Sequence, residues 1–168
     1  MEASRATSTR RSVLVLAVLL ALCAALTAAM ILTLTRPRPA GRALPTTRVQ
    51  IGNQPFTLEI ADNPGEREIG LMHRDHLDAD HGMLFVFPDS RTREFWNHEV
   101  AFPLDLIFLD GDGMVVSIKG MQAYSDLAVS SDVPAQYAVE LNAGSAQRLW
   151  LSVGARLSLP ADLIKPAR

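Results

Sequence analysis

The chain has 168 residues, of which 48% are hydrophobic, and a formal net charge of −2. Residues 1–43 carry six Arg and one Glu, whereas residues 44–168 carry ten Lys or Arg and seventeen Asp or Glu. The net charge of −7 on the second part is repelled by phosphate backbones, so we expect no nucleic acid among the partners. Cys23 is the single cysteine, which excludes disulfides and thiolate nucleophiles from residues 44–168.

An uncharged apolar run extends from Val13 to Leu34. As a helix it would be about 33 Å long, enough to cross the hydrocarbon core of a bilayer. We therefore predict a basic tail at 1–12 and a transmembrane helix or uncleaved signal anchor at 13–34. Arginines flank both ends almost equally, but a short tail before one apolar segment resembles an export signal, which favours a domain outside the cytoplasm.

The alternative for this segment is a cleaved signal peptide and a secreted protein. Arg10 and Arg11 would form its basic region, and residues 27–29 (Thr-Ala-Ala) a weak cleavage site. Retention is favoured because the apolar run is longer than a usual signal core and continues past that site. We interpret Cys23 as a small apolar residue on a lipid-facing helix.

The next stretch, residues 35–45, is rich in Pro and Arg and is predicted to be a linker. Residues 46–160 are then predicted to form one globular domain, followed by a C-terminal tail at 161–168. A length of about 115 residues is common for a single domain.

The domain is predicted to be mainly β. Apolar residues alternate with polar ones at 49–51, 56–60 and 137–141, which is the period of half-buried strands. Further strands are expected at 83–87, 95–96, 104–109, 114–118 and 156–159. Two short helices are expected, one from the N-cap candidate Asn63 to about Met72 and one at 145–149. This pattern is typical of a compact single-domain β-sandwich or barrel-like sheet.

Several motifs occur in an order that resembles one family. They are Ile60-Ala61-Asp62, Gly70-Leu71-Met72, Gly82-Met83-Leu84-Phe85-Val86-Phe87-Pro88, Phe95-Trp96, Pro103-Leu104-Asp105 and Glu140-Leu141-Asn142-Ala143-Gly144. Together they are similar to domain of unknown function 192 over residues 49–159. The resemblance implies a small, mainly β, single-domain fold and no particular activity. Members often carry Met-Lys-Asn-Thr after the Trp, where this chain has Asn97-His98-Glu99-Val100.

Two polar segments contain residue types found in metal sites, but neither has the ligand spacing of such a site. The histidine-rich and aspartate-rich run at 73–81 repeats no zinc-ligand spacing, so we interpret it as a solvated loop. The Asp-Gly-Asp-Gly sequence at 110–113 starts like a calcium loop, but its twelfth position is Met121 instead of Glu. We expect a tight turn there and neither a metal nor a cofactor in the protein.

The candidate ligand-binding residues are Glu94, Trp96, His98, Asp105 and Asn142. In a strand, residues 94, 96 and 98 share one face, which would align a carboxylate, an indole and an imidazole. Residues 140 and 142 share another face, and Asn142 is included because the resemblance places it in the family's most recognisable motif; the alternative is a strand exit at 142–144, with the Asn capping the following turn. We predict that Glu94, Trp96, His98 and Asn142 border one concave surface that binds a small polar ligand.

Two classes of function follow from these residues. The first is a membrane-anchored, non-catalytic module that binds a small ligand or an envelope component. The alternative is a hydrolase that uses His98 with Glu94, Glu99 or Asp105 as the neighbouring carboxylate. The absence of serine-elbow, zinc and phosphate-loop motifs favours the binding module.

Overall fold

The protein is described by a computed structural model that covers residues 21–27 and 43–163. The chain divides into two compact units between Ala43 and Leu44, and each is described by itself. In the first, residues 21–27 are helical, with Cys23 exposed. Among the described residues no helix is both long and apolar enough to cross a membrane, and positions 13–20 and 28–34 of the predicted span lie outside them.

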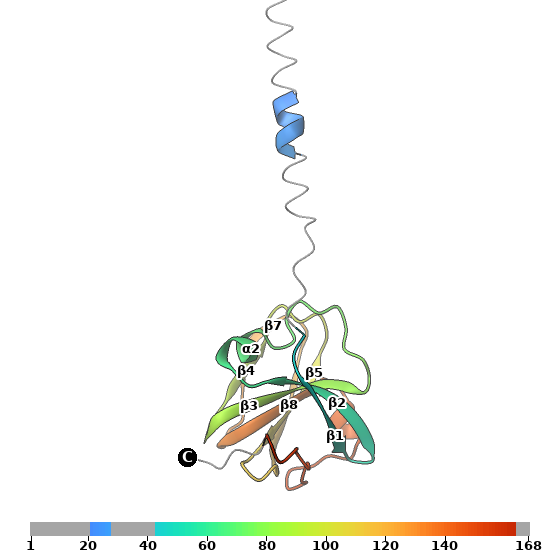
Figure 1. The fold of residues 1–168 in the computed structure, drawn as a ribbon, viewed down its shortest axis with the longest axis vertical. Coiled ribbons are helices and arrows are strands. Elements are labelled where there is room, and N and C mark those ends of the chain that lie inside the picture. The colour runs from blue at the N-terminus through green and yellow to red at the C-terminus, as the bar shows by residue number, and fades with distance from the viewer. Residues whose placement is uncertain (1–20, 28–42, 164–168) are drawn as a thin grey trace, which may run out of the picture. The chain divides into compact units, whose positions relative to one another are not determined.

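The second unit is mainly β with two short helices, as predicted (Figure 1). Its strands are β1 (Thr46–Ile51), β2 (Gln54–Ala61), β3 (His81–Arg91), β4 (Glu94–Asn97), β5 (Leu104–Leu109), β6 (Val115–Met121), β7 (Ser125–Ser130) and β8 (Ala135–Asn142). Its helices are α2 (Pro64–Ile69) and α3 (Ser145–Arg148).

Six of the strands form one mixed sheet in the order β1-β2-β3-β8-β5-β6. The β2–β3 pair is parallel and the other pairs are antiparallel. Strands β1 and β6 are its two edges, so the described strand pairing leaves the sheet open rather than closed into a barrel. The remaining strands, β4 and β7, pair with each other as a separate antiparallel ribbon.

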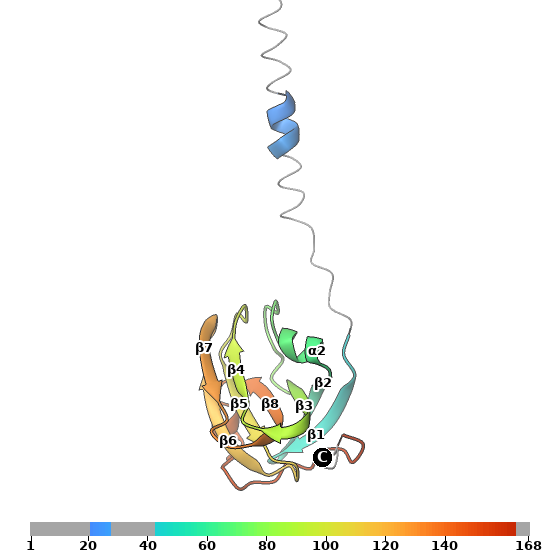
Figure 2. The same ribbon diagram turned by 90° about the vertical axis from the view of Figure 1, so that its left-hand side faces the viewer.

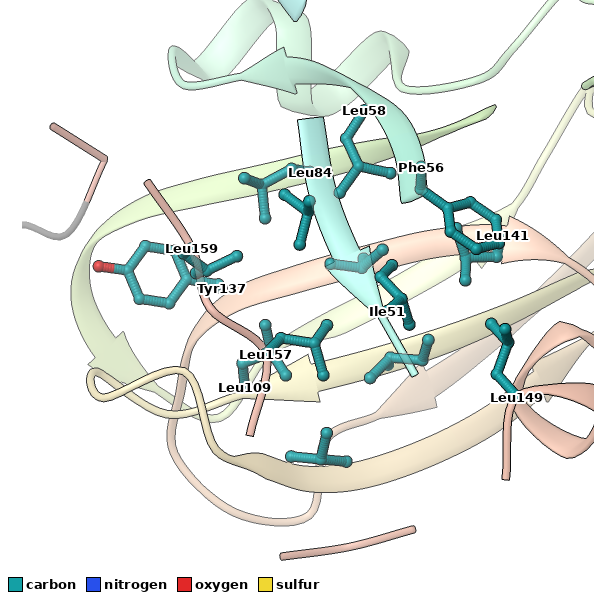
Figure 3. Packing of buried hydrophobic residues seen from close by; sticks show 14 of the residues in the cluster. Ile51, Phe56, Leu58, Leu84, Leu109, Tyr137, Leu141, Leu149, Leu157 and Leu159 are labelled. Carbon is teal, nitrogen blue, oxygen red and sulfur yellow. The ribbon is translucent and has the colours of Figure 1, made fainter. Parts of the chain in front are cut away.

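One face of the sheet supports the first core, which Figure 3 shows from close by. Side chains of β1, β2, β3, β5 and β8 meet there, and the C-terminal segment covers them. Tyr137, Phe56 and Ile51 are its largest fully buried members. Leu157 and Leu159 of the C-terminal segment are buried in the same cluster.

The opposite face supports the second core, defined by Ala61, Leu71, Met83, Phe85, Phe95, Val100, Leu104, Leu106, Phe108, Met121, Ala135 and Ala138. Successive residues of a strand point to opposite faces, so Phe85 belongs to this core while Leu84 and Val86 belong to the first. Both α2 and β4 lie on one side of β3 and β8 in the two perpendicular views (Figures 1 and 2).

Helix α2 begins as the sequence predicts and ends three residues earlier. The Asn63 side chain accepts a hydrogen bond from the Glu66 amide at 3.1 Å, and Pro64 occupies the first turn. The helix stops at Ile69 because Gly70 adopts a φ of +50°, which glycine tolerates at a C-cap. Leu71 then turns into the second core.

The predicted strand at 156–159 is wrong. Only an isolated bridge between Met114 and Arg156 is formed there, and Leu157 is held by its amide, which donates to the Gly113 carbonyl at 2.9 Å. The alternating leucines are buried, but they cover a core instead of extending a sheet. Strand β7, in contrast, has no buried residue and is not among the predicted strands.

Candidate functional site

A cavity of about 550 Å³ lies beside the second core, within the range typical of small-molecule sites. Its walls come from α2 and the segment after it, from β3 and from β4, while β8 contributes Glu140. The lining residues are Pro64, Arg67, Glu68, Ile69, Gly70, Leu71, Met72, Phe85, Phe87, Pro88, Asp89, Arg91, Thr92, Arg93, Glu94, Phe95, Trp96, Asn97, Val100 and Glu140.

Three phenylalanines form the aromatic part of the wall. The Phe95 ring packs edge-on against Phe85 and Phe87, with centroid distances of 5.0 and 6.2 Å. The guanidinium groups of Arg67 and Arg93 lie over the Phe87 ring, 5.1 and 4.0 Å from its centroid. These contacts hold the rings in fixed orientations, so the apolar wall is formed before any ligand arrives.

Glu140 is the ionisable residue buried in this cavity. Its neighbours across the sheet are Met83 on β3 and Leu106 on β5, both in the second core. The residue is 4% exposed, and no hydrogen bond or ion pair joins its carboxyl group to any described residue. Burial raises the pKa of Glu140 from 4.5 to about 8, and the positive charge of Arg74 lowers it only in part.

Arg74 does not neutralise Glu140 because it is engaged elsewhere. Its guanidinium donates two hydrogen bonds to the carboxylate of Glu59, at 2.5 and 2.8 Å. This bidentate pair raises the pKa of Arg74. Glu140 is therefore mostly protonated at neutral pH and lies as a neutral carboxyl group among apolar side chains.

Asn97 provides a second buried polar group. It is 1% exposed, and its Nδ2 donates to the carbonyls of Phe102 at 3.0 Å and Gln122 at 2.8 Å. Both amide hydrogens are thereby used. Its Oδ1 is a buried acceptor without a partner among the described residues. An unpaired buried acceptor costs about 1–3 kcal/mol.

The cations at this cavity are already bound. Arg67 donates to the carbonyls of Asp62 at 2.6 Å and Val86 at 2.9 Å. Arg93 donates to the Ala135 carbonyl at 3.1 Å and pairs with the carboxylate of Asp89. In contrast, the exposed carboxylates of Glu68 and Glu94 form no ion pair within the described residues.

Two of the five predicted site residues line the cavity. They are Glu94 and Trp96, which lie on β4, and the Trp96 side chain is 48% exposed. His98 is not among the lining residues because β4 ends at Asn97 and residue 98 lies in a turn. The predicted alignment of residues 94, 96 and 98 on one strand face therefore does not extend to the imidazole of His98.

His98 has a carboxylate partner, but not the one predicted from the strand spacing. Its Nδ1 lies 2.5 Å from Asp126 Oδ1, and its Nε2 lies 3.6 Å from Glu99. The hydrogen bond to Asp126 raises the pKa of His98 above its ordinary value of 6.5. The pair is exposed and lies outside the cavity lining.

The other two predicted residues hold backbone segments. Asp105 Oδ2 accepts from the Ala146 amide at 2.8 Å, at the start of α3. Asn142 Nδ2 donates to the carbonyls of Leu77 at 2.9 Å and Asp78 at 3.2 Å, and so fastens the loop before β3. Neither residue lines the cavity. Ligand binding by any of the five stays a prediction.

The predicted solvated loop at 73–81 contains no assembled metal site. His76 and His81 each lie near an aspartate of the same loop, at 3.6 and 2.9 Å. Over the described residues, no group of three His, Cys, Asp or Glu side chains is placed to hold an ion. The chemistry of the candidate site therefore rests on Glu140, Asn97 and the aromatic wall.

The sequence is 31% identical over 108 residues to human Ras-related protein R-Ras, a match that covers 64% of this chain. The chain spans about half, 48%, of the length of that relative. The phosphate-binding pattern G-x-x-x-x-G-K-[ST] does not occur in the sequence, so this match supports no nucleotide site.

Two solved structures share the fold, each with a TM-score of 0.62. One, from Sinorhizobium meliloti, is assigned provisionally as a transcription regulator; it is 36% identical, and the match covers 66% of this chain and 89% of that one. The other is a protein of unknown function from Novosphingobium aromaticivorans; it is 27% identical, and the match covers 74% and 91%. The model of the family DUF192, described as "Uncharacterized ACR", matches residues 47–159, and the chain belongs to this family.

Proposed function

We propose that residues 44–163 form a non-catalytic module that binds a small molecule with an apolar body and one polar end. The observation that carries this proposal is the preformed cavity with two buried polar groups: the Glu140 carboxyl group, to which no hydrogen bond is formed within the described residues, and Asn97 Oδ1, which has no hydrogen-bond partner there. Apolar cavities with a few directed polar groups are the usual form of small-ligand sites. The apolar wall accounts for the body of the ligand and the buried groups for its polar end.

The cavity does not support the hydrolase alternative. Its lining contains no Ser, Cys, His, Lys or Tyr. Glu140 has the raised pKa of a general acid. The other lining groups that could act as a base or nucleophile are the carboxylates of Glu68, Asp89 and Glu94 and the Thr92 hydroxyl, and no hydrogen bond within the described residues joins any of them to Glu140. His98 and Asp126 form a carboxylate–imidazole pair at the surface, away from the enclosed space. Binding without catalysis is therefore the simpler interpretation.

The two tryptophans provide a direct test. Trp96 lines the cavity, whereas Trp150 is 91% exposed and does not. A Trp150→Phe variant leaves Trp96 as the single indole, and Trp96→Phe is the matched control. We titrate both with 2-phenylethylamine, 2-phenylethanol and 3-phenylpropionate. At least one compound should change the emission of Trp96 saturably and leave Trp150 unchanged. Equal responses from both variants, or none from either, would overturn the proposal.

The stability of a Trp96 variant distinguishes binding from packing. A fully buried aromatic residue costs about 3–5 kcal/mol when it is replaced by Ala. Because Trp96 is half-exposed, Trp96→Ala should cost much less and should weaken binding of the same compounds. A loss as large as that of a core residue, with binding unchanged, would show that Trp96 is only structural.

We also propose that a helix at residues 13–34 anchors the module in a membrane, with the module outside the cytoplasm. Support comes from the uncharged apolar run alone. Carbonate extraction should leave the full chain in the membrane pellet. A shorter chain in the supernatant that begins near Met30 would instead establish cleavage and secretion.

The provisional assignment of the Sinorhizobium meliloti relative as a transcription regulator raises DNA as a ligand. We infer that this chain does not bind DNA, because residues 44–168 carry a net charge of −7. Fluorescence anisotropy with random-sequence duplex DNA at low salt should show no binding. Salt-sensitive binding in the micromolar range would contradict the inference.

A further inference from the structure

We propose that the cavity selects a primary amine, with the ammonium group bound by the Glu140 carboxylate and the apolar body against the aromatic wall. This inference rests on the proposed function and specifies its ligand class. The observation that carries it is the placement of a buried carboxyl group in the lining of the cavity. A ligand that enters the cavity loses its water shell, and this carboxyl group can replace the lost hydrogen bonds.

The first argument is the hydrogen-bonding capacity of the buried polar atoms. Asn97 Nδ2 donates to two backbone carbonyls, so the amide can offer a ligand only its oxygen. Glu140 offers two oxygens when it is ionised. An ammonium group has three donors and no acceptor, which matches this set. A carboxylate ligand would place acceptor against acceptor, and a hydroxyl has a single donor.

The second argument is electrostatic. The guanidinium groups of Arg67 and Arg93 are held by protein acceptors, so they are poorly available to an anion. The third arginine of the lining, Arg91, is largely exposed, and it pairs with the Asp89 carboxylate at 2.7 Å. Glu68 and Glu94 lie at the same cavity with free carboxylates. The half-exposed Trp96 ring also lines the cavity and can attract a cation, whereas guanidinium groups already lie over the Phe87 ring. Each of these features favours a positively charged ligand over a neutral or negative one of equal shape.

The proton balance follows from the state of Glu140. At pH 7 the empty site holds mostly the protonated carboxyl group, because burial raises the pKa of Glu140 to about 8. The amine arrives as R–NH₃⁺, and its charge stabilises the carboxylate form. The carboxyl O–H bond breaks, its proton passes to the buffer, and all N–H bonds of the ligand remain. Arg74 is the charged group that lowers the pKa of Glu140. The other charged side chains at the cavity are Arg67, Arg91, Arg93, Glu68, Asp89 and Glu94.

The test is isothermal titration calorimetry of the full chain at pH 7, in phosphate and in HEPES. The three probes share a phenyl body and differ in the head group: 2-phenylethylamine, 2-phenylethanol and 3-phenylpropionate. Glu140→Gln is the matched variant, because it keeps the shape of the side chain and removes its charge. If the full chain requires detergent, each probe partitions into it to the same extent in both samples. The partition therefore cancels when the affinity of one probe is compared between the wild type and Glu140→Gln.

In the wild-type chain the amine should bind about tenfold or more tightly than the alcohol, because charge-assisted hydrogen bonds are about twice as strong as neutral ones. Its binding should release about one proton, measured as a difference in heat between the two buffers, whereas the alcohol releases none. Glu140→Gln should abolish the proton release and most of the preference for the amine.

The opposite results separate this inference from the proposed function. If the alcohol or the acid binds as tightly as the amine, or if the preference survives in Glu140→Gln, the amine specificity is wrong and the cavity remains a binding site. If no probe binds at millimolar concentration and Trp96 emission is unchanged, both proposals are overturned.

Discussion

Burial of Glu140 should make the stability of the domain depend on pH in a way that a glutamine at this position would not. The pKa of its carboxyl group is raised from 4.5 to about 8 by desolvation, so the folded state holds the proton more tightly than the unfolded state does. The resulting contribution to stability is fully present below pH 4.5. It is lost as the pH rises through the interval up to the folded pKa of about 8.

The size of the effect follows from the two pKa values. A tenfold difference in acid constant corresponds to about 1.36 kcal/mol, so the interval from 4.5 to about 8 corresponds to about 5 kcal/mol at most. About 3 kcal/mol of this is already lost at pH 7. We therefore expect the difference in unfolding free energy between Glu140→Gln and the wild type to grow by about 4 kcal/mol from pH 5 to pH 9.

Urea unfolding of both proteins at a series of pH values measures this difference. Other titrating groups, such as Asp89 and His98, occur in both chains, so their contributions cancel. Glu94→Gln is the control, because it makes the same substitution at a carboxylate that is exposed at the same cavity. Parallel curves for Glu140→Gln would refute the reasoning, since they would show that Glu140 ionises freely in the folded protein.

Three further changes test the local structure. Asn63→Ala should lower the unfolding free energy by about 1 kcal/mol in urea titrations through loss of the α2 cap, whereas Asn63→Asp should keep it. Gly82→Ala should cost about 1–3 kcal/mol or more, because its Cβ would lie 2.6 Å from a backbone carbonyl oxygen; Gly120→Ala, with open space around it, should change thermal stability little. Asp126→Asn should lower the pKa of His98 toward 6.5 in an NMR titration of its ring protons, and an unchanged value would exclude their hydrogen bond.

The sequence pattern locates the strands that have one or two buried faces, and it misses the one that has none. Alternation at β1 and β2 matches their burial. Strand β7 has no buried residue and is held by its ladder with β4, so its sequence carries no periodic signal. Leu157 and Leu159 show the reverse: they alternate and are buried, but they lie in a covering segment. Alternation therefore reports burial of side chains and not backbone pairing.

Glu140, the main residue of the candidate site, is not among the residues predicted from the sequence. Residues 135–141 of β8 are all buried, a pattern typical of a strand covered on both faces. In the sequence, the polar residues at 136 and 140 alternate with apolar ones at 137, 139 and 141, which is the pattern of a half-buried strand, so the sequence alone does not reveal the burial of Glu140. Sequence analysis selected Asn142 from the same face, and that side chain fastens a loop instead.

The sequence could not predict which residues come together at the site. Periodicity shows which side chains share a face of a strand, but it does not show which strands are neighbours in the sheet. The order β3-β8-β5 places Glu140 between strands that are distant from it in the sequence. A bulge before Asn97 and the end of β4 then separate Trp96 from His98. Asn97 is the last residue of β4 and is buried there. Its amide nitrogen donates to two backbone carbonyls, and its Oδ1 is left buried without a partner among the described residues. This arrangement depends on contacts with residues 102 and 122, which the sequence spacing does not predict.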